Sequence, residues 1–120
     1  MRFPKTPIIR TREDVELFLQ QFLPKFNVWG ILFLDREKNQ ETLKLLDMTP
    51  HMREDIIRSI DVVDYVETIQ DMMSWGDMWV FGKDVKGTEL YIKIAMGQPS
   101  AHTICISFHI AEHPITYAFK

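Results

Sequence analysis

The last third of the chain most constrains its fold, because residues 77–120 contain three successive strand-forming segments. These segments are Met78–Lys83, Leu90–Met96 and Thr103–His109, and a glycine-containing turn sequence separates each pair. In the middle segment, apolar residues at 90, 92 and 94 alternate with Tyr91 and Lys93, which is the period of a strand that places one face on a core. The region therefore predicts an antiparallel meander in which Tyr91 and Lys93 share the other face.

Two helices are expected ahead of the meander, one on each side of a short strand. Thr11 is a typical N-cap residue, and apolar residues at 15, 18, 19 and 22 define one face of a helix that Pro24 is expected to end. Val28–Leu34 is a continuous apolar run, typical of a strand buried on both faces, in which Gly30 suggests a bulge or a close backbone approach. A charged turn over residues 35–40 then leads to a short helix at Glu41–Asp47.

A third helix is expected to begin at the Thr49–Pro50 pair, which combines an N-cap residue with proline at the first helical position. Beyond this helix, Val62–Val66 has the composition of a strand and Glu67–Ser74 that of a loop. Helices first and a meander last predict an α+β fold, with the N-terminal helices packed on one face of a mostly antiparallel sheet. The other face of such a sheet is free for a site.

The composition is typical of one soluble globular domain that covers residues 1–120. Of the 120 residues, 46% are hydrophobic and 26% are charged, which argues against disorder. The longest apolar runs are too short to span a bilayer, and the first residues lack the apolar stretch of a signal peptide. A single cysteine, Cys105, rules out an internal disulfide. We expect a cytoplasmic protein that has no membrane partner.

Charge is distributed unevenly along the chain. The net charge of −3 argues against binding of nucleic acid through bulk charge. Residues 78–120, however, hold four lysines against three carboxylates, together with three of the four histidines. A local cationic site in the meander is therefore compatible with the overall charge. The sequence contains no Gly-rich phosphate loop, Cys-x-x-Cys pair or Gly-x-Ser-x-Gly elbow, which removes many nucleotide-binding, redox and hydrolase classes.

The candidate catalytic set consists of four side chains in the meander, namely Lys83, Tyr91, Lys93 and His109. If the three strands are neighbours, two ammonium groups, a phenol and an imidazole share one face of the sheet. Cleavage of RNA by its own 2′-hydroxyl needs a base, an acid and a cation for the developing phosphorane charge, and these groups supply all three. The competing interpretation is an ordinary solvent-exposed face, because alternation alone carries little information about function.

Aromatic and basic residues around this set are candidates for RNA binding. Trp79 and Tyr117 have the flat surfaces on which single-stranded bases stack, and Lys86 and His113 add to the local positive charge. Core packing is the alternative for Trp79, because it lies in an apolar strand. A different class of function is a non-catalytic module that holds a protein or a small ligand with the Trp- and Met-rich stretch Met72–Phe81.

A metal site is the third alternative, because His109, Glu112 and His113 match the inverted zincin pattern H-x-x-E-H. That chemistry needs a helix, so that two imidazoles one turn apart face one metal ion. Here the segment follows a strand and runs into Pro114, which disfavours a helix. We therefore expect no metal and no other cofactor. Cys105 lies in an apolar strand, which is typical of an inert buried thiol.

Two segments of the meander resemble the MqsR-type toxins, which are bacterial mRNA interferases of the RelE-like superfamily. The segments are Gly87–Ile94, which reads G-T-E-L-Y-I-K-I, and Ile104–His109, which reads I-C-I-S-F-H. The order of elements from Glu13 to His109 is also similar to that of the family. The resemblance implies a RelE-like fold and a type II toxin that cleaves mRNA without a metal ion. It further implies a cognate antitoxin as partner and mRNA, on the ribosome in RelE relatives, as substrate.

The resemblance also implies roles for particular residues. Tyr91 matches the family's active-site tyrosine, Lys93 matches a lysine of the same motif, and Lys83 falls near a basic position on the preceding strand. His109 stands where the family has a lysine implicated in cleavage, so Tyr91 and His109 are expected to act as acid and base. The chain departs from the family in three respects. A lysine after the acidic–aromatic pair Asp64–Tyr65 and a glutamine before the hairpin have no counterpart here, and the family is basic whereas this chain is acidic.

Overall fold

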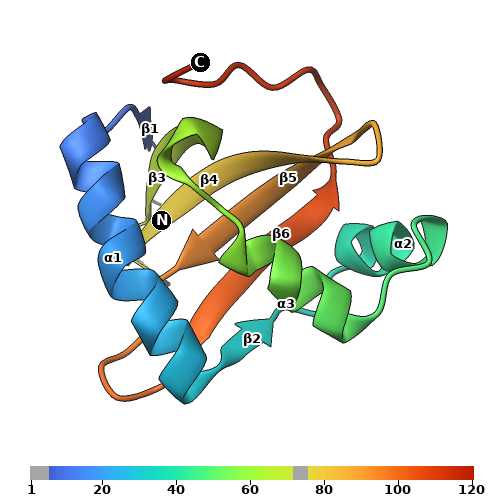
Figure 1. The fold of residues 1–120 in the computed structure, drawn as a ribbon, viewed down its shortest axis with the longest axis horizontal. Helices are drawn as coiled ribbons and strands as arrows, with labels where there is room; N and C mark the ends of the chain where they lie inside the picture. The colour runs from blue at the N-terminus through green and yellow to red at the C-terminus, as the bar shows by residue number, and fades with distance from the viewer. Residues whose placement is uncertain (1–5, 72–75) are drawn as a thin grey trace, which may run out of the picture.

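A computed structural model describes residues 6–71 and 76–120 of the chain (Figure 1). The elements in chain order are β1 (Thr6–Ile8), α1 (Arg12–Trp29), β2 (Ile31–Phe33), α2 (Glu37–Leu45), α3 (Pro50–Arg58), the 3-10 helix η1 (Val62–Asp64), β3 (Tyr65–Asp71), β4 (Gly76–Val85), β5 (Thr88–Ala95) and β6 (Thr103–Ile110). Residues Met72–Trp75, which belong to the Trp- and Met-rich stretch and, up to Ser74, to the expected loop, fall outside the described residues.

Within the described residues, six strands form one sheet in the order β1-β3-β4-β5-β6-β2. Neighbouring strands are antiparallel except for β2 and β6, which are parallel. Helices α1 and α3 lie across one face of the sheet, and α2 packs beside β6 at the edge of the sheet (Figure 1). The α+β class, with helices on one face of a mostly antiparallel sheet that ends in the meander β4-β5-β6, is thereby confirmed.

The main core lies between the sheet and α1. Phe22 and Phe26 of α1 belong to the same buried cluster as Ile92 of β5 and Phe108 of β6. The residues at 90, 92 and 94 of β5 are all fully buried, as the period-two pattern predicts. Because burial of each large apolar side chain contributes about 1.5–3 kcal/mol, a slip of one residue in β5 would be very costly. The side chains at 91 and 93 are consequently held on the opposite face of the sheet.

Helix α1 begins where the sequence predicts and ends later. The Thr11 hydroxyl accepts a hydrogen bond from the Asp14 amide at 3.1 Å, which is the expected N-cap contact. The helix then continues through Pro24 to Trp29, so the prediction that Pro24 ends it is wrong. Proline removes one backbone hydrogen bond, but the buried aromatic residues before and after it keep the helix against the sheet. Among the described residues no helix, α1 included, is long and apolar enough to span a membrane.

Strand β2 is shorter and more exposed than the apolar run predicts. Val28 and Trp29 belong to α1, and Gly30 ends that helix with a φ of 82°, which glycine adopts without strain. Gly30 therefore acts as a helix C-cap and not as a bulge in a strand. Because β2 pairs only with β6 at the edge of the sheet, Leu32 is 44% exposed, and the expected burial on both faces is wrong.

Helix α2 begins at Glu37, within the segment expected to be a charged turn, because two of its side chains bond to β6. The Asn39 amide donates to the carbonyls of Leu34 and Ile106 at 3.0 and 3.1 Å and accepts from the Phe108 amide at 2.9 Å. Thr42 accepts from the Ile110 amide at 3.0 Å. Strand β2 pairs with residues 103–105 of β6 and no further along it. The side chains of Asn39 and Thr42 therefore form hydrogen bonds with the backbone groups of β6 that β2 leaves unpaired.

The segment between α3 and the meander is more regular than its composition suggests. The N-cap contact of α3 is confirmed, since the Thr49 hydroxyl accepts from the Met52 amide at 3.2 Å. Val62–Asp64, expected to start a strand, forms a 3-10 turn that Asp61 and Asp64 cap reciprocally. The expected loop from Glu67 is instead strand β3 as far as Asp71, because it pairs on one side with β1 and on the other with β4.

Candidate functional site

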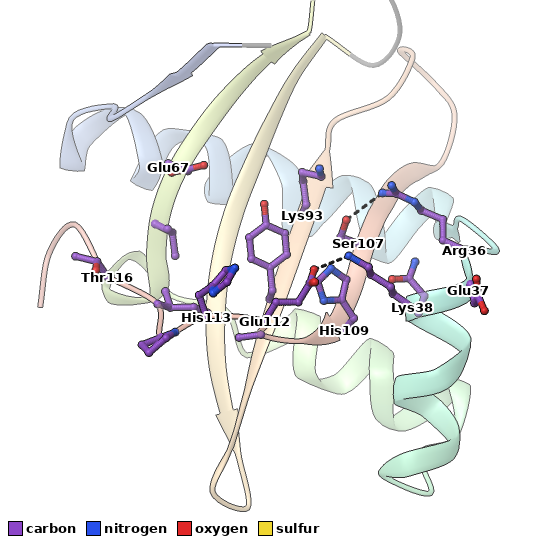
Figure 2. A pocket seen from close by; sticks show the side chains of 16 residues that line it. Arg36, Glu37, Lys38, Glu67, Lys93, Ser107, His109, Glu112, His113 and Thr116 are labelled. Carbon is purple, nitrogen blue, oxygen red and sulfur yellow. Dashed lines mark hydrogen bonds and ion pairs between the residues drawn. The ribbon is translucent and has the colours of Figure 1, made fainter. Parts of the chain in front are cut away.

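A groove of about 770 Å³ lies on the face of the sheet opposite α1 and α3 (Figure 2). Its floor is formed by the outward-facing side chains of β5 and β6. The first turn of α2 forms one wall, and the segment Ala111–Thr116 after β6 forms the other. Two residues of β3, Val66 and Glu67, complete the lining. The groove therefore lies on the face that α1 and α3 leave free, and the meander contributes its central residues.

Tyr91 and His109 form the centre of the floor. The two residues lie directly opposite each other in the β5–β6 register. Their rings are stacked, with centroids 5.2 Å apart and an angle of 16° between the ring planes. Cross-strand neighbours on one face are the closest side-chain pairs in a sheet, so the strand register alone brings the phenol and the imidazole together.

The hydrogen bond of His109 defines which ring nitrogen is available to a ligand. Nδ1 lies 2.9 Å from the carbonyl oxygen of Ile110. A carbonyl can only accept a hydrogen bond, so in the neutral ring the proton resides on Nδ1 and the lone pair on Nε2. This arrangement leaves Nε2 as the atom of His109 that can take a proton.

The environment of Tyr91 favours its protonated form. Burial raises the pKa of the Tyr91 phenol, the nearby Glu67 carboxylate raises it further, and the Arg36 guanidinium lowers it. The net shift is upward, so the phenol keeps its proton at neutral pH and can act as a hydrogen-bond donor or a general acid.

Two cations lie beside this pair. Lys93 is one step along β5 from Tyr91 on the same face, and Ser107 lies opposite it on β6. Arg36, the N-cap residue of α2, donates from Nη1 to the Ser107 hydroxyl at 3.3 Å, and Ser107 is only 2% exposed. Figure 2 shows Lys93, Ser107 and Arg36 side by side at one end of the floor. A phenol, an imidazole, an ammonium and a guanidinium group thus line one groove.

The segment after β6 is held across the sheet by Glu89 of β5. The Glu89 carbonyl accepts from the Ala111 amide at 2.9 Å, and its carboxylate accepts from the Ile115 amide at 3.0 Å and the Tyr117 hydroxyl at 3.1 Å. Burial and Glu89 together raise the pKa of Tyr117 to about 12. A Cβ atom on Gly82 would lie 2.5 Å from the Tyr117 hydroxyl, so this close approach requires glycine. The second wall is therefore a fixed part of the fold.

An ion pair connects the two walls beside His109. The Lys38 ammonium, from the first turn of α2, lies 2.5 Å from the Glu112 carboxylate (Figure 2). Both side chains are more than half exposed, at 60% and 55%. The Lys38 hydrogen bond and charge lower the pKa of Glu112, and the charges of His109 and His113 act in the same direction. Glu112 is therefore ionised and surrounded by basic groups.

The structure brings together three of the four expected catalytic residues and separates the fourth. Lys83 of β4 lies opposite Leu90, whose side chain is in the core, so Lys83 is on the helix-covered face. Its ammonium forms an ion pair with Asp64 at 3.1 Å. The expectation that Lys83 shares a face with Tyr91 is corrected, because odd-numbered residues of β4 face the opposite way from odd-numbered residues of β5.

Three of the four expected RNA-binding residues also lie outside the groove. Trp79 stacks on Phe18 of α1 with ring centroids 4.3 Å apart, which agrees with the alternative of core packing. Lys86 is in the turn between β4 and β5, and Tyr117 is bonded to Glu89 beyond the wall. His113 does line the groove. Sequence reasoning missed Arg36, Lys38, Glu67 and Ser107, and only the docking of α2 and the strand register bring these residues to the site.

The positions of the residues give little support to the two alternative functions, a binding module built on the Trp- and Met-rich stretch and a metal site. Of the Trp- and Met-rich stretch, Met78, Val80 and Phe81 are fully buried, and residues 72–75 lie outside the described residues. The zincin-like histidine His109 is in a strand and not in a helix. Within residues 6–71 and 76–120, no group of three or more metal-ligating side chains is placed to hold a metal ion. Cys105 is fully buried, as expected.

Comparisons with models of known protein families, with curated proteins and with solved structures gave no match. The likeness to MqsR-type toxins therefore rests on the motifs at residues 87–94 and 104–109 and on the order of elements between Glu13 and His109. The fold and the groove define an α+β protein with a phenol–imidazole pair between basic groups on the open face of its sheet.

Proposed function

We propose that this protein is a metal-independent endoribonuclease, and that it acts as the toxin of a type II toxin–antitoxin pair. The observation that carries the proposal is the stacked Tyr91–His109 pair, which lies beside Lys93 and Arg36 on the floor of the groove. The likeness to MqsR-type toxins supports the same assignment, because it independently points to Tyr91, Lys93 and His109. Arg36 enters the proposal from the geometry alone.

In the proposed reaction His109 is the general base. Its Nε2 removes the proton of the ribose 2′-hydroxyl, and the 2′-oxygen attacks the adjacent phosphorus. As the bond from phosphorus to the 5′-oxygen breaks, the Tyr91 hydroxyl donates its proton to that leaving oxygen. The products are a 2′,3′-cyclic phosphate and a 5′-hydroxyl, and water returns both side chains to their starting protonation states.

The cations have a separate task in this scheme. Lys93 and Arg36 stabilise the additional negative charge of the phosphorane as the 2′-oxygen attacks. Fixed positive charges in a partly desolvated groove stabilise a developing charge more than mobile water does. The Ser107 hydroxyl, which accepts a hydrogen bond from Arg36, holds the guanidinium toward the floor. Ser107 is thus a positioning residue, and Arg36 is expected to contact the phosphate.

The cellular role follows from the resemblance. A cognate antitoxin is proposed to neutralise the protein by binding it, and mRNA, on the ribosome as in RelE relatives, is the proposed substrate. The acidic net charge of −3 argues that the groove, and not the overall surface, supplies the attraction for RNA.

The test is cleavage of single-stranded RNA by the purified protein in the presence of a metal chelator. Tyr91→Phe and His109→Ala should each lower the rate by about 10²–10⁴-fold, the usual contribution of a general acid or base, with unchanged thermal unfolding. Arg36→Gln should lower it as well. Lys86→Asn is the matched control, because it removes a lysine outside the groove and asparagine tolerates the φ of 54° at that position.

Two results would count against the proposal. A 3′-hydroxyl and a 5′-phosphate as product ends would exclude attack by the 2′-hydroxyl, because that attack leaves a 2′,3′-cyclic phosphate or the 3′-phosphate formed by its hydrolysis. Folded protein that neither cleaves RNA nor arrests growth when it is expressed without an antitoxin would instead favour a non-catalytic binding module of the same fold.

A further inference from the structure

The ion pair between Lys38 and Glu112 combines fixed backbones with displaceable side chains. Lys38 precedes Asn39, which is 2% exposed and makes three hydrogen bonds to the chain around β6. Glu112 follows Ala111, whose amide is bonded to Glu89. The two backbones are therefore anchored, while the carboxylate and the ammonium group meet at the exposed mouth of the groove.

The carboxylate of Glu112 lies where an anionic ligand of this groove would find its charge partners. It is bonded to Lys38, and the imidazoles of His109 and His113 add positive charge next to it when they are protonated. His109 belongs to the proposed catalytic pair, so this position is next to the reacting groups and on the side away from Lys93 (Figure 2). A nucleic acid strand that crosses the floor from Lys93 to His109 would carry its next phosphate toward Lys38.

We propose that Lys38 and His113 form a second phosphate subsite for the RNA strand, and that Glu112 occupies this subsite in the free protein. The inference rests on the proposed function, because it adds a neighbouring phosphate of the same strand. Binding of RNA displaces the Glu112 carboxylate, and a phosphate replaces it on Lys38. Glu112 thereby weakens the binding of any anion to the groove until a strand of sufficient length provides a phosphate to replace it.

The strength of the pair is suited to such an exchange. A solvent-exposed ion pair changes an equilibrium constant only a few-fold. A phosphate diester carries a full negative charge and two free oxygens, so it can accept from Lys38 as the carboxylate does. Glu112 is thus a competitor that RNA can displace and not a permanent lock.

The test measures the binding of an uncleavable strand, 2′-O-methyl RNA, so that the result does not depend on catalysis. Glu112→Gln should tighten binding about three- to fivefold at low salt, the effect expected for release of one exposed ion pair. Glu37→Gln is the matched control, because Glu37 lines the same groove from the neighbouring position of α2 and loses the same charge. Glu37→Gln should tighten binding of the strand by less than half as much as Glu112→Gln does.

Lys38→Gln provides the second arm of a double-mutant cycle. In the Lys38→Gln background, the additional substitution Glu112→Gln should no longer tighten binding beyond the general effect seen with Glu37→Gln. The dependence of log affinity on log salt should be steeper in Glu112→Gln than in wild type, because in wild type the displaced Glu112 carboxylate takes up a cation that offsets part of the counterion release.

Equal effects of Glu112→Gln and Glu37→Gln, or the same effect of Glu112→Gln with and without Lys38, would refute the subsite. If wild-type protein still cleaves RNA in that case, the proposed function stands and only this inference fails. If no variant binds the strand and wild type cleaves no RNA, both proposals fail together.

Discussion

The proposed role of His109 depends on two contacts of its own imidazole ring. The bond from Nδ1 to the Ile110 carbonyl orients the ring, and the stack on Tyr91 holds the imidazole beside the phenol ring. The lysine that the resemblance to MqsR-type toxins places at this position has neither a ring to stack nor a second nitrogen to anchor. The geometry therefore favours a base at His109 and leaves the cationic task to Lys93 and Arg36.

Glu67 provides a pH test of the role of Tyr91. Activity that needs the protonated phenol is present below the pKa of Tyr91 and is lost as the pH rises through it. Burial and Glu67 raise that pKa, so the alkaline limb of the pH–rate profile should lie above the ordinary tyrosine value. Glu67→Gln removes one of the two causes, and the limb should move to lower pH.

The control for this shift is a direct titration of phenolate absorbance in wild type, Glu67→Gln and Tyr91→Phe. The component that disappears in Tyr91→Phe should move in the same direction as the activity limb. An alkaline limb that stays in place in Glu67→Gln, while the absorbance titration moves, would show that Tyr91 is not the acid.

At the scale of elements, the docking of α2 against β6 decides whether a site exists. The helix carries Arg36 and Lys38 into the groove, and Asn39 and Thr42 fix it by bonding to the edge of β6 that β2 does not cover. The helix has an unremarkable polar sequence with only two buried residues, both polar. Its position thus depends mainly on hydrogen bonds, to which the partly buried Leu43 adds an apolar contact with the core.

Asn39→Asp tests this dependence. The side chain keeps its size but can no longer donate to the carbonyls of Leu34 and Ile106, and it places a charge in a buried position. We expect the free energy of unfolding to fall by about 2–4 kcal/mol, because two buried acceptors lose their partner. Urea unfolding measures the change.

Thr42→Val is the milder counterpart of that substitution. It removes only the acceptor of the Ile110 amide and should cost about 1–2 kcal/mol. RNA cleavage should fall in both variants at temperatures where they remain folded, since Arg36 and Lys38 move with the helix. A loss in Asn39→Asp no larger than in Thr42→Val would mean that α2 is held by other contacts.

At the scale of the whole molecule, Cys105 reports on opening of the core. The thiol is fully buried, and burial raises its pKa to about 12 from an ordinary value of 9.0. We expect no alkylation of the native protein at mildly alkaline pH, and rapid alkylation once urea unfolds it. Because the folded-state pKa is raised, the contribution of the thiol to stability is complete below pH 9.0 and is lost as the pH rises toward 12.

Labelling of native protein at the rate of a free thiol would contradict the closed core. The control is Cys105→Ala, which should show no labelling in either state because the chain has a single cysteine. Ala keeps the position apolar, and the loss of one sulfur should cost only a modest part of the stability.

Local patterns in the sequence determine a large part of this molecule. The period of two in β5 fixes the face of Tyr91 and Lys93, Thr11 and Thr49 begin helices, and the turn residues separate the three strands of the meander. Each of these features depends on neighbours within a few residues, so the sequence alone is sufficient to predict it. The pairing of Tyr91 with His109 follows from the same meander once its strands are adjacent.

Tertiary structure decided the rest, because the responsible contacts join residues far apart in the chain. Pro24 is tolerated in α1 because the sheet buries the aromatic residues around it, and β3 is a strand because β1 and β4 pair with it. The register between β4 and β5 places Lys83 on the face of the sheet that the helices cover. Hydrogen bonds between Asn39 and β6 hold α2 so that Arg36 lies at the groove on the opposite face. The sequence thus determined which strands carry Tyr91, Lys93 and His109, whereas only the packing of distant elements added Arg36 to the site and kept Lys83 out of it.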